Sequence, residues 1–352
     1  MDDTHVGDAA PLLSLVTPAF NEEASLEEFY RQAAACLDAA GYSWEIIMVD
    51  DGSSDATSAV IEKIHQRDRR VRGVSFARNF GNQIAVSAGL AAARGRAVVI
   101  IDADLQHPIE LIPAMVKAWK SGYQIVNTVR RYGNKAPLSK RFLSAVFYKI
   151  MNFLSGTKIE TAAPDFKLLD RKVVDLLVQM PERTRYLKAL IPWLGFTHTS
   201  IPFDCKERYA GKTSFNFMRL AELALDGIIS FTTKPLRWII YLGSLVLLIT
   251  VPYGCWALFQ FCFLGPKTAG WTSLILVNLL LGGTTLISLG ILGEYIGRIY
   301  NEVKQRPLYT VKKTWGIDEK KIAQAAFGRD QDGGPQTGPN GRAEEHDDRT
   351  DL

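Results

Sequence analysis

The sequence has few cysteines and little excess charge. Its 352 residues include four cysteines and five histidines, and the formal net charge is +4 at pH 7. The cysteines lack the paired spacings of metal sites, and two of them lie in long apolar runs, so we expect them to be reduced or inert. The small net charge, without a basic cluster on a nucleic-acid module, argues against binding to nucleic acid.

Common phosphate-binding motifs are also missing. The chain has no G-x-x-x-x-G-K-[ST] sequence, and no G-x-G-x-x-G follows its first apolar run. These absences argue against a P-loop enzyme and a dinucleotide-binding dehydrogenase. Residues 1–5 are acidic and lack the regions of a signal peptide, so we expect the N-terminus to be cytoplasmic.

Hydropathy separates a soluble-looking part, residues 1–210, from two apolar runs between residues 235 and 297. Each run is close to the roughly 20 residues that span a bilayer. Basic residues flank the pair, whereas the connecting loop holds Lys267 alone; the flanking residues are Lys234, Arg237, Arg298, Lys304, Arg306, Lys312 and Lys313. The positive-inside rule then places both termini in the cytoplasm.

Six segments are therefore predicted along the chain. Residues 214–231 combine an apolar side with a narrow polar stripe, which favours a helix lying in the membrane interface over an ordinary core helix. The last residues are rich in Gly, Asp and Arg, which indicates disorder. The segments are a cytoplasmic catalytic domain (1–210), an amphipathic interfacial helix (211–234), transmembrane helices (235–263 and 271–297), a cytoplasmic extension (298–327) and a disordered tail (328–352).

Apolar runs alternate with helical stretches in the first part, which predicts an α/β domain with a mainly parallel sheet. We expect strands at residues 12–17, 44–49, 71–76, 98–101 and 124–129. Pro18 is expected to break the first strand, and Asn21 to begin a helix. A helix of small residues is predicted from Asn82 to Ala93.

Two carboxylates end the most apolar of these strands. Asp102 and Asp104 follow residues 98–101 directly. Ligands of open α/β sheets bind at the carboxyl ends of strands, and paired carboxylates suit Mg²⁺ or Mn²⁺. Such ions keep positions for water and phosphate, so the pair predicts a nucleotide-diphosphate site. The alternative is that the two residues merely cap the helix that Pro108 opens.

Five motifs in order resemble one family. The sequences at residues 17–23, 49–55 and 102–108 resemble glycosyltransferase family 2, whose GT-A fold is Rossmann-like. Pro164-Asp-Phe and Arg208-Tyr-Ala-Gly-Lys-Thr-Ser-Phe, followed by two spans, resemble its polyprenyl-phosphate glycosyltransferases. That group includes dolichol-phosphate mannose synthase and bactoprenol glucosyltransferase. The resemblance covers about residues 12–309.

The resemblance implies roles for individual residues. The base and ribose of a nucleotide sugar would lie at Pro18, Phe20, Glu22 and Asp51, with Asp50 either beside them or serving as a turn residue. Metal and diphosphate would lie at Asp102 and Asp104, with Gln106 alongside. His107 is either a further ligand or a structural residue.

The second substrate implied by the resemblance is a lipid phosphate. Its expected cations are Arg131, Arg141, Arg208 and Lys212, with Arg130 and Lys140 as competing neighbours. Asp165 occupies the position of an essential carboxylate. A phosphate monoester is largely dianionic near pH 7 because its second pKa is about 6. Asp165 would therefore orient the acceptor or stabilise positive charge on the sugar; its alternative role is a helix or turn cap.

The resulting expectation is an inverting glycosyltransferase of the cell inner membrane, possible as a homo-oligomer, that moves glucose from UDP-glucose to a polyprenyl phosphate such as undecaprenyl phosphate. GDP-mannose, UDP-N-acetylglucosamine and an aminoarabinose donor stay open. A processive polysaccharide synthase is a second hypothesis, although Lys234-Pro-Leu-Arg-Trp has Lys where the Q-x-x-R-W motif has Gln. A lipid flippase or transporter is the third, and two spans without charge before Glu294 disfavour it.

Overall fold

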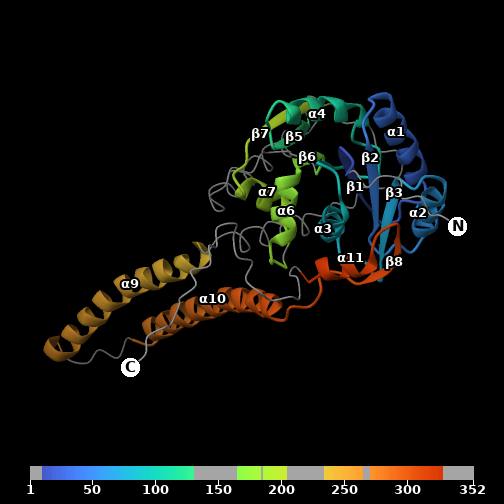
Figure 1. The fold of residues 1–352 in the computed structure, drawn as a ribbon. Helices are drawn as coiled ribbons and strands as arrows, with labels where there is room; N and C mark the ends of the chain where they lie inside the picture. Colours follow the sequence, from blue (N-terminus) through green and yellow to red (C-terminus); the bar gives the residue numbers. More distant parts are fainter. Residues whose placement is uncertain (1–9, 131–164, 184, 204–233, 265–269, 328–352) are drawn as a thin grey trace, which may run out of the picture.

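The computed structural model describes residues 10–130, 165–183, 185–203, 234–264 and 270–327. Within these ranges, an α/β/α domain is followed by two long helices and a short C-terminal segment (Figure 1). The predicted tail (328–352) and all but the last residue of the predicted interfacial helix (211–234) lie outside the described residues.

The described residues form a sheet in the order β7-β5-β6-β4-β1-β2-β3-β8. Four neighbouring pairs are parallel, and β6 and β8 run antiparallel to their neighbours. The five predicted strands are confirmed to within two residues at each end, in a sheet that is mainly parallel but mixed. The strands are β1 (Leu13–Ala19), β2 (Trp44–Asp50), β3 (Val71–Phe76), β4 (Ala97–Ile100), β5 (Ile125–Arg130), β6 (Lys167–Asp170), β7 (His198–Phe203) and β8 (Val311–Trp315).

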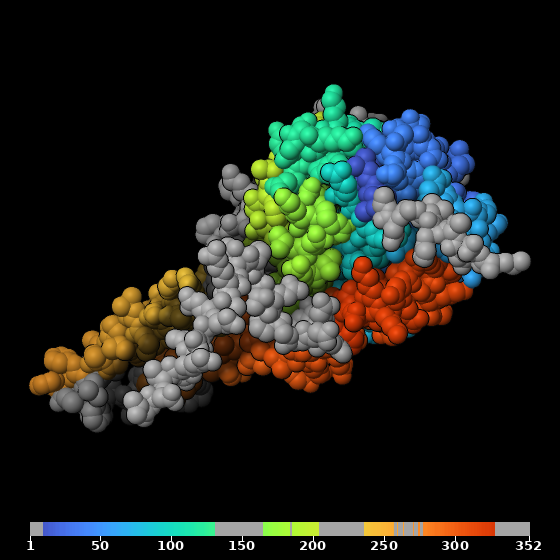
Figure 2. Space-filling model, viewed as in Figure 1, coloured from blue at the N-terminus to red at the C-terminus, as the bar shows by residue number. Residues whose placement is uncertain are grey.

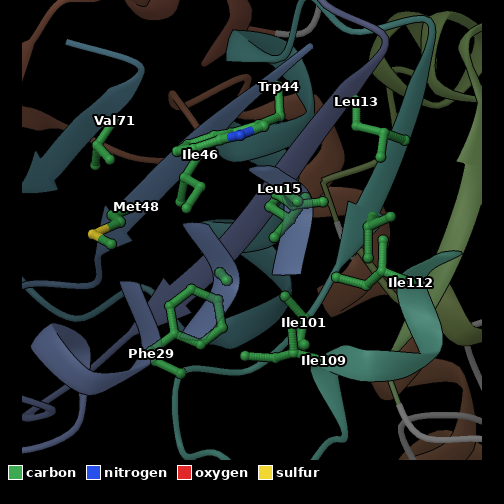
Figure 3. Packing of buried hydrophobic residues seen from close by; sticks show 14 of the residues in the cluster. Leu13, Leu15, Phe29, Trp44, Ile46, Met48, Val71, Ile101, Ile109 and Ile112 are labelled. Carbon is green, nitrogen blue, oxygen red and sulfur yellow. The ribbon is translucent and has the colours of Figure 1, made fainter. Parts of the chain in front are cut away.

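Helices cover both faces of the sheet. One face carries α1 (Leu26–Ala39), α2 (Thr57–Arg67) and α4 (Ile112–Lys120); the other carries α3 (Asn82–Ala92), α6 (Arg171–Gln179), α7 (Leu187–Trp193) and α11 (Glu319–Ala325). In β4, Val99 belongs to the first core cluster, while Val98 and Ile100 belong to the second. This burial on both faces explains the strand's continuous apolar sequence. Figure 3 shows the first cluster, in which Phe29 of α1 lies near Leu15 and Ile101.

The prediction that Pro18 breaks the first strand is wrong. Pro18 pairs with Val49 inside β1. The Val16 carbonyl accepts from Ile101 on the β4 side, and the Ala19 carbonyl accepts from Asp51 on the β2 side. Alternation along the strand therefore turns the Pro18 nitrogen toward β4, whose pairing with β1 has already ended at Val16. No sheet hydrogen bond needs an N–H at that place, so proline is tolerated.

Two apolar helices, α9 (Lys234–Leu264) and α10 (Trp271–Val303), extend from the domain. The segments Leu236–Trp256 of α9 and Val277–Val303 of α10 are long and apolar enough to cross a membrane. Only 6% of the first segment and 0% of the second is buried. The two helices project together from the rounded domain in Figure 2. At 33 residues, α10 is about 50 Å long, more than the ~30 Å hydrocarbon core of a bilayer.

The chain returns to the domain after α10. Strand β8 pairs antiparallel with β3 at the edge of the sheet. Just before it, the Tyr309 ring stacks on Phe76 at 4.7 Å between centroids, and its hydroxyl donates to the Ile322 carbonyl at 2.9 Å. The segment predicted as an extension (298–327) therefore completes the catalytic sheet.

A buried ion pair ties this edge to the centre of the sheet. Glu45 of β2 accepts from the Ser14 hydroxyl at 2.7 Å, from the Arg94 N–H at 2.7 Å and from Arg72 at 2.8 Å. Arg72 of β3 also donates to the Gly316 carbonyl, just beyond β8. Burial works to raise the pKa of Glu45, but these hydrogen bonds and the Arg72 charge outweigh it and hold the pKa below its ordinary value.

We predict that Glu45→Gln destabilises the chain by about 3 kcal/mol at pH 7, because it leaves the buried Arg72 without a counter-charge. A carboxyl group whose pKa is lower in the folded state stabilises that state at pH values above its unfolded pKa. This stabilisation is lost as the pH falls through the folded-state pKa. The wild type should therefore lose more unfolding free energy than the variant below about pH 4.5, the ordinary glutamate value. Denaturant unfolding of the full chain in detergent at pH 7 and pH 4 measures both effects.

The matched control is Glu62→Gln. Glu62 pairs with Lys313 of β8 at 2.8 Å, but both side chains are exposed. An exposed ion pair contributes little to stability because water screens it, so this variant should be nearly neutral. Equal losses for the two variants would contradict the buried-pair explanation.

Candidate functional site

The topology gathers five chain segments at one edge of the sheet. Strands β1, β2 and β4 are parallel, so their carboxyl ends share this edge. Because β6 runs antiparallel to β4, with Ile100 opposite Lys167, its beginning lies there too and carries Asp165. Strand β5 is antiparallel to β6 in turn, so its end brings Arg130 to the same edge.

The loops after β1 and β2 are bonded to each other. The Asn21 N–H donates to the Ser53 hydroxyl, and the Ser54 N–H donates back to the Asn21 side chain, both at 2.9 Å. The Glu22 N–H donates to the Thr57 hydroxyl at 2.9 Å. These cross-loop bonds replace the first helical turn, so the prediction that a helix begins at Asn21 is wrong and α1 begins at Leu26.

All five residues predicted to hold the base and ribose, including Glu22, lie in these loops or beside them. Pro18 is buried in β1, whereas Phe20 is 47% exposed at its end. Asp50 accepts from the Ser53 N–H at 2.9 Å and the Ser75 hydroxyl at 2.6 Å, contacts that suit the turn role. Asp51 accepts from two N–H groups in the loop after β3, those of Phe80 at 2.7 Å and Gly81 at 2.9 Å.

The surroundings of Asp51 also disfavour the charged form of its carboxyl group. Burial raises its pKa, the neighbouring Asp50 adds to the rise, and the two N–H donors oppose it. A buried carboxylate that bonds the loop after β3 fixes the position of that loop against the loop after β2. Nucleotide contact by Asp50, Asp51 and Glu22 stays a prediction.

Three carboxylates interact electrostatically at this end of the sheet. Burial, together with the negative charges of Asp165 and Asp104, raises the pKa of Asp102 to about 7, while Lys188 and Arg130 oppose the rise. The Lys188 ammonium lies 3.5 Å from Asp165 Oδ2. Among the described residues, the charges of Lys188 and Arg130 do not outweigh the effects of burial and carboxylate repulsion on Asp102.

The donor chemistry fits a divalent cation. Within the described ranges, no three His, Cys, Asp or Glu side chains gather as a ready metal site. Asp102 and Asp104 would supply two oxygen ligands, and the remaining positions would be left to water or substrate. Carboxylate oxygens are the ligands that Mg²⁺ and Mn²⁺ prefer. A cation here would displace the proton that Asp102 otherwise retains near neutral pH.

The loop that carries these carboxylates turns sharply. Leu105 has φ of 60°, in the left-handed region that few residues with a Cβ adopt. The Gln106 N–H donates to Asp104 Oδ1 at 3.1 Å, which holds the turn. Gln106 therefore lies beside the carboxylates, as expected.

His107 follows this turn and points into the protein. Its ring lies 5.3 Å from the Phe166 ring and 5.9 Å from the Phe203 ring. Burial lowers its pKa to about 4, so the imidazole is neutral. Its Nδ1 is 3.8 Å from Asp102 Oδ2. Burial between two phenylalanines favours the structural reading over a role as metal ligand.

The four cations predicted for the lipid phosphate, Arg131, Arg141, Arg208 and Lys212, lie outside the described residues, so their role stays a prediction. Among the described residues, Arg130 and Lys188 act on Asp102. Arg130 could have been chosen from its place at a strand end, whereas Lys188 lies in no motif.

Helix α7, which carries Lys188, is anchored at its start. The Leu187 N–H donates to the Gln83 side chain of α3 at 3.2 Å. A few residues earlier, the Arg183 N–H donates to Glu302 of α10 at 3.0 Å. The position of Lys188 is thus fixed from the domain on one side and from an apolar helix on the other.

Comparison with known proteins agrees with this architecture. Residues 14–177 match the model described as glycosyl transferase family 2. The chain is 43% identical over 306 residues to an uncharacterized glycosyltransferase of Synechocystis, a match covering 87% of this chain and 96% of that protein. It is 41% identical over 302 residues to the SfII prophage-derived bactoprenol glucosyl transferase of Shigella flexneri, covering 86% and 98%.

A solved structure is more distantly similar. Glucosyl-3-phosphoglycerate synthase from Mycobacterium tuberculosis, in complex with Mn²⁺, UDP-glucose and phosphoglyceric acid, is 20% identical. The match covers 62% of this chain and 78% of that chain, with a TM-score of 0.43.

The contact between the loops after β2 and β3 can be tested at Gly52, which has φ of 69°. A Cβ there would lie 2.2 Å from the Arg78 carbonyl carbon, which belongs to the loop that Asp51 holds. We predict that Gly52→Ala costs about 1–2 kcal/mol for the left-handed backbone and about 1–3 kcal/mol more for the clash. It should also weaken UDP binding, measured by calorimetry, because the loop must move.

Gly41→Ala is the matched control. Gly41 has φ of 67°, but a Cβ there would meet no atom within 4 Å. It carries the same backbone strain without the clash, so UDP affinity should not change. Similar UDP affinities for both variants would show that the loop bonded by Asp51 does not influence nucleotide binding.

Proposed function

This chain belongs to glycosyltransferase family 2 and is a hexosyltransferase with a GT-A domain, and on that premise we propose that it transfers glucose from UDP-glucose to a polyprenyl phosphate. Undecaprenyl phosphate is the acceptor we propose, and the transfer inverts the anomeric centre. The enzyme would be a multi-pass protein of the inner membrane, with its catalytic domain and both termini in the cytoplasm.

The observation that carries the proposal is the Shigella relative. It is named a bactoprenol glucosyl transferase, and the match at 41% identity covers 98% of its length. The physical arrangement supports the same acceptor. A carboxylate-rich site at the sheet edge is joined to two helices that are long and apolar enough to cross a membrane.

In the proposed reaction, an acceptor phosphate oxygen bonds to the sugar's anomeric carbon from the face opposite the nucleotide. The bond from that carbon to the diphosphate breaks, and UDP leaves with the bonding electrons. Asp102 and Asp104 would hold a Mg²⁺ or Mn²⁺ ion, which would supply positive charge for the departing diphosphate. Phe20, Glu22 and Asp51 would bind the nucleoside, with Pro18 and Asp50 supporting their loops.

Asp165 has a role without proton transfer in this scheme. A phosphate monoester near pH 7 is already largely dianionic, because its second pKa is about 6. Asp165 would orient the acceptor or stabilise positive charge that grows on the sugar. The ammonium of Lys188, 3.5 Å away, keeps the carboxylate in place for either task.

The acceptor phosphate needs cations. We propose Arg131, Arg141, Arg208 and Lys212 for this role, as the sequence motifs imply. Arg130 and Lys188 add positive charge beside Asp102, so the phosphate would approach the carboxylates with its charge partly balanced.

The function is tested by offering the purified full chain undecaprenyl phosphate with UDP-glucose, UDP-N-acetylglucosamine, GDP-mannose or an aminoarabinose nucleotide. Formation of lipid-linked glucose from UDP-glucose supports the proposal. Transfer from one of the other donors would change the identity of the transferred sugar and leave the rest of the proposal standing. A long polymer would indicate a processive synthase, and lipid translocation without transfer would indicate a flippase.

We predict that EDTA abolishes transfer and that added Mg²⁺ or Mn²⁺ restores it. Asp104→Asn should lower the rate about 10²- to 10³-fold, the usual loss when one group that stabilises transition-state charge is removed. The control is Asp175→Asn, which alters an exposed residue of α6 that pairs with Arg171. Full activity in EDTA would exclude the metal.

We also predict the membrane topology. Because β8 pairs with β3, the chain after α10 must lie on the side of the catalytic domain. Reporter fusions should show cytoplasm after Leu352 and the exterior at Thr268, between the two helices. The same side for both fusions would contradict two membrane crossings.

A further inference from the structure

The imidazole of His107 is buried without a hydrogen-bond partner. The residue is 3% exposed, and within the described part of the chain neither ring nitrogen has a partner. A buried polar group in this state costs roughly 1–3 kcal/mol. Such a cost at the edge of a functional site calls for a compensating role.

The ring is held in place by its neighbours. Phe166 and Phe203 pack against it, and Phe166 directly follows Asp165. On its other side, the left-handed Leu105 and the bond from Gln106 to Asp104 fix the backbone of the loop. The ring therefore has little freedom, and its Nδ1 stays 3.8 Å from Asp102 Oδ2.

We propose that His107 is a positioning residue for Asp102, whose Oδ2 accepts a hydrogen bond from His107 Nδ1–H when a divalent cation binds. The 3.8 Å between His107 Nδ1 and Asp102 Oδ2 exceeds the usual N···O distance of a hydrogen bond by about 1 Å or less. Bonds of this kind are often long in unliganded sites and shorten in the complex. The inference rests on the proposed function in taking Asp102 as a metal ligand.

The chemistry favours support over ligation. The neutral imidazole has one N–H to donate, and a carboxylate oxygen of Asp102 lies 3.8 Å from Nδ1. Hard cations prefer oxygen, and phenylalanine rings flank the imidazole. Groups that bond metal ligands orient them, and their removal weakens metal affinity about 10- to 100-fold.

Three substitutions separate the functions of the ring. His107→Asn keeps an N–H donor near the Nδ1 position, His107→Gln keeps one near the Nε2 position, and His107→Phe keeps the aromatic packing alone. The full-length chain in detergent is titrated with Mn²⁺ at saturating UDP. Calorimetry gives the affinity, and the Mn²⁺ electron paramagnetic resonance spectrum reports its ligand geometry.

We expect His107→Asn to retain the wild-type Mn²⁺ affinity within about threefold, while His107→Gln and His107→Phe lose about 10- to 100-fold. The metal-free His107→Phe chain should unfold at the wild-type temperature or above, because an apolar ring replaces two unpartnered nitrogens. A merely structural histidine would give the opposite pattern, with lower stability and unchanged Mn²⁺ affinity.

Wild-type Mn²⁺ affinity in His107→Phe would overturn the proposal, and so would a loss in His107→Asn as large as in His107→Phe. If the wild-type chain itself binds no Mn²⁺, the metal part of the proposed function fails and this role fails with it. Normal Mn²⁺ binding by all three variants would overturn the role of His107 and leave the proposed function intact.

Discussion

Repulsion among carboxylates is the constraint on which the site depends. Asp102, Asp104 and Asp165 meet in a partly buried space, and burial with this repulsion raises the pKa of Asp102 to about 7. Such a cluster persists because the surrounding elements hold it rigidly. Two sheet strands bring the acidic residues together, and Lys188 and Arg130 offset part of their charge. The negative charge that remains among the described residues is the physical basis for the proposed cation site.

The apolar helix α10 contacts the segment that leads to the site. Glu302 near the end of α10 accepts from the Arg183 N–H, and α7 with Lys188 begins four residues later. On the far edge, β8 joins β3, and Tyr309 stacks on Phe76. The domain is thus attached to α10 through two separate sets of contacts. A rigid attachment holds the carboxylate edge in a constant relation to the helices, as a lipid-linked acceptor requires.

Sequence reasoning succeeded where chemistry is local to a strand and its loop. Asp102 and Asp104 follow the carboxyl end of β4, as the apolar run before them indicates, and the parallel strands follow from β-branched repeats. It failed where the answer depends on partners distant in the chain. Pro18 is tolerated because β4 has ended beside it, and Asn21 bonds a loop more than thirty residues away instead of starting a helix. Lys188 has no motif, and β8, which contains Lys312 and Lys313, is a strand that the sequence pattern does not predict.

The late position of β8 sets an order of events during synthesis. The contact between Arg72 and Gly316 joins residues 244 positions apart, and both apolar helices lie between them. A ribosome must therefore release α9 and α10 before the edge of the catalytic sheet is covered. Until then β3 is an open edge, able to pair with other chains. Completion of the enzyme's sheet thus follows delivery of its two helices, so a polypeptide that stalls before residue 311 keeps an unfinished, aggregation-prone edge.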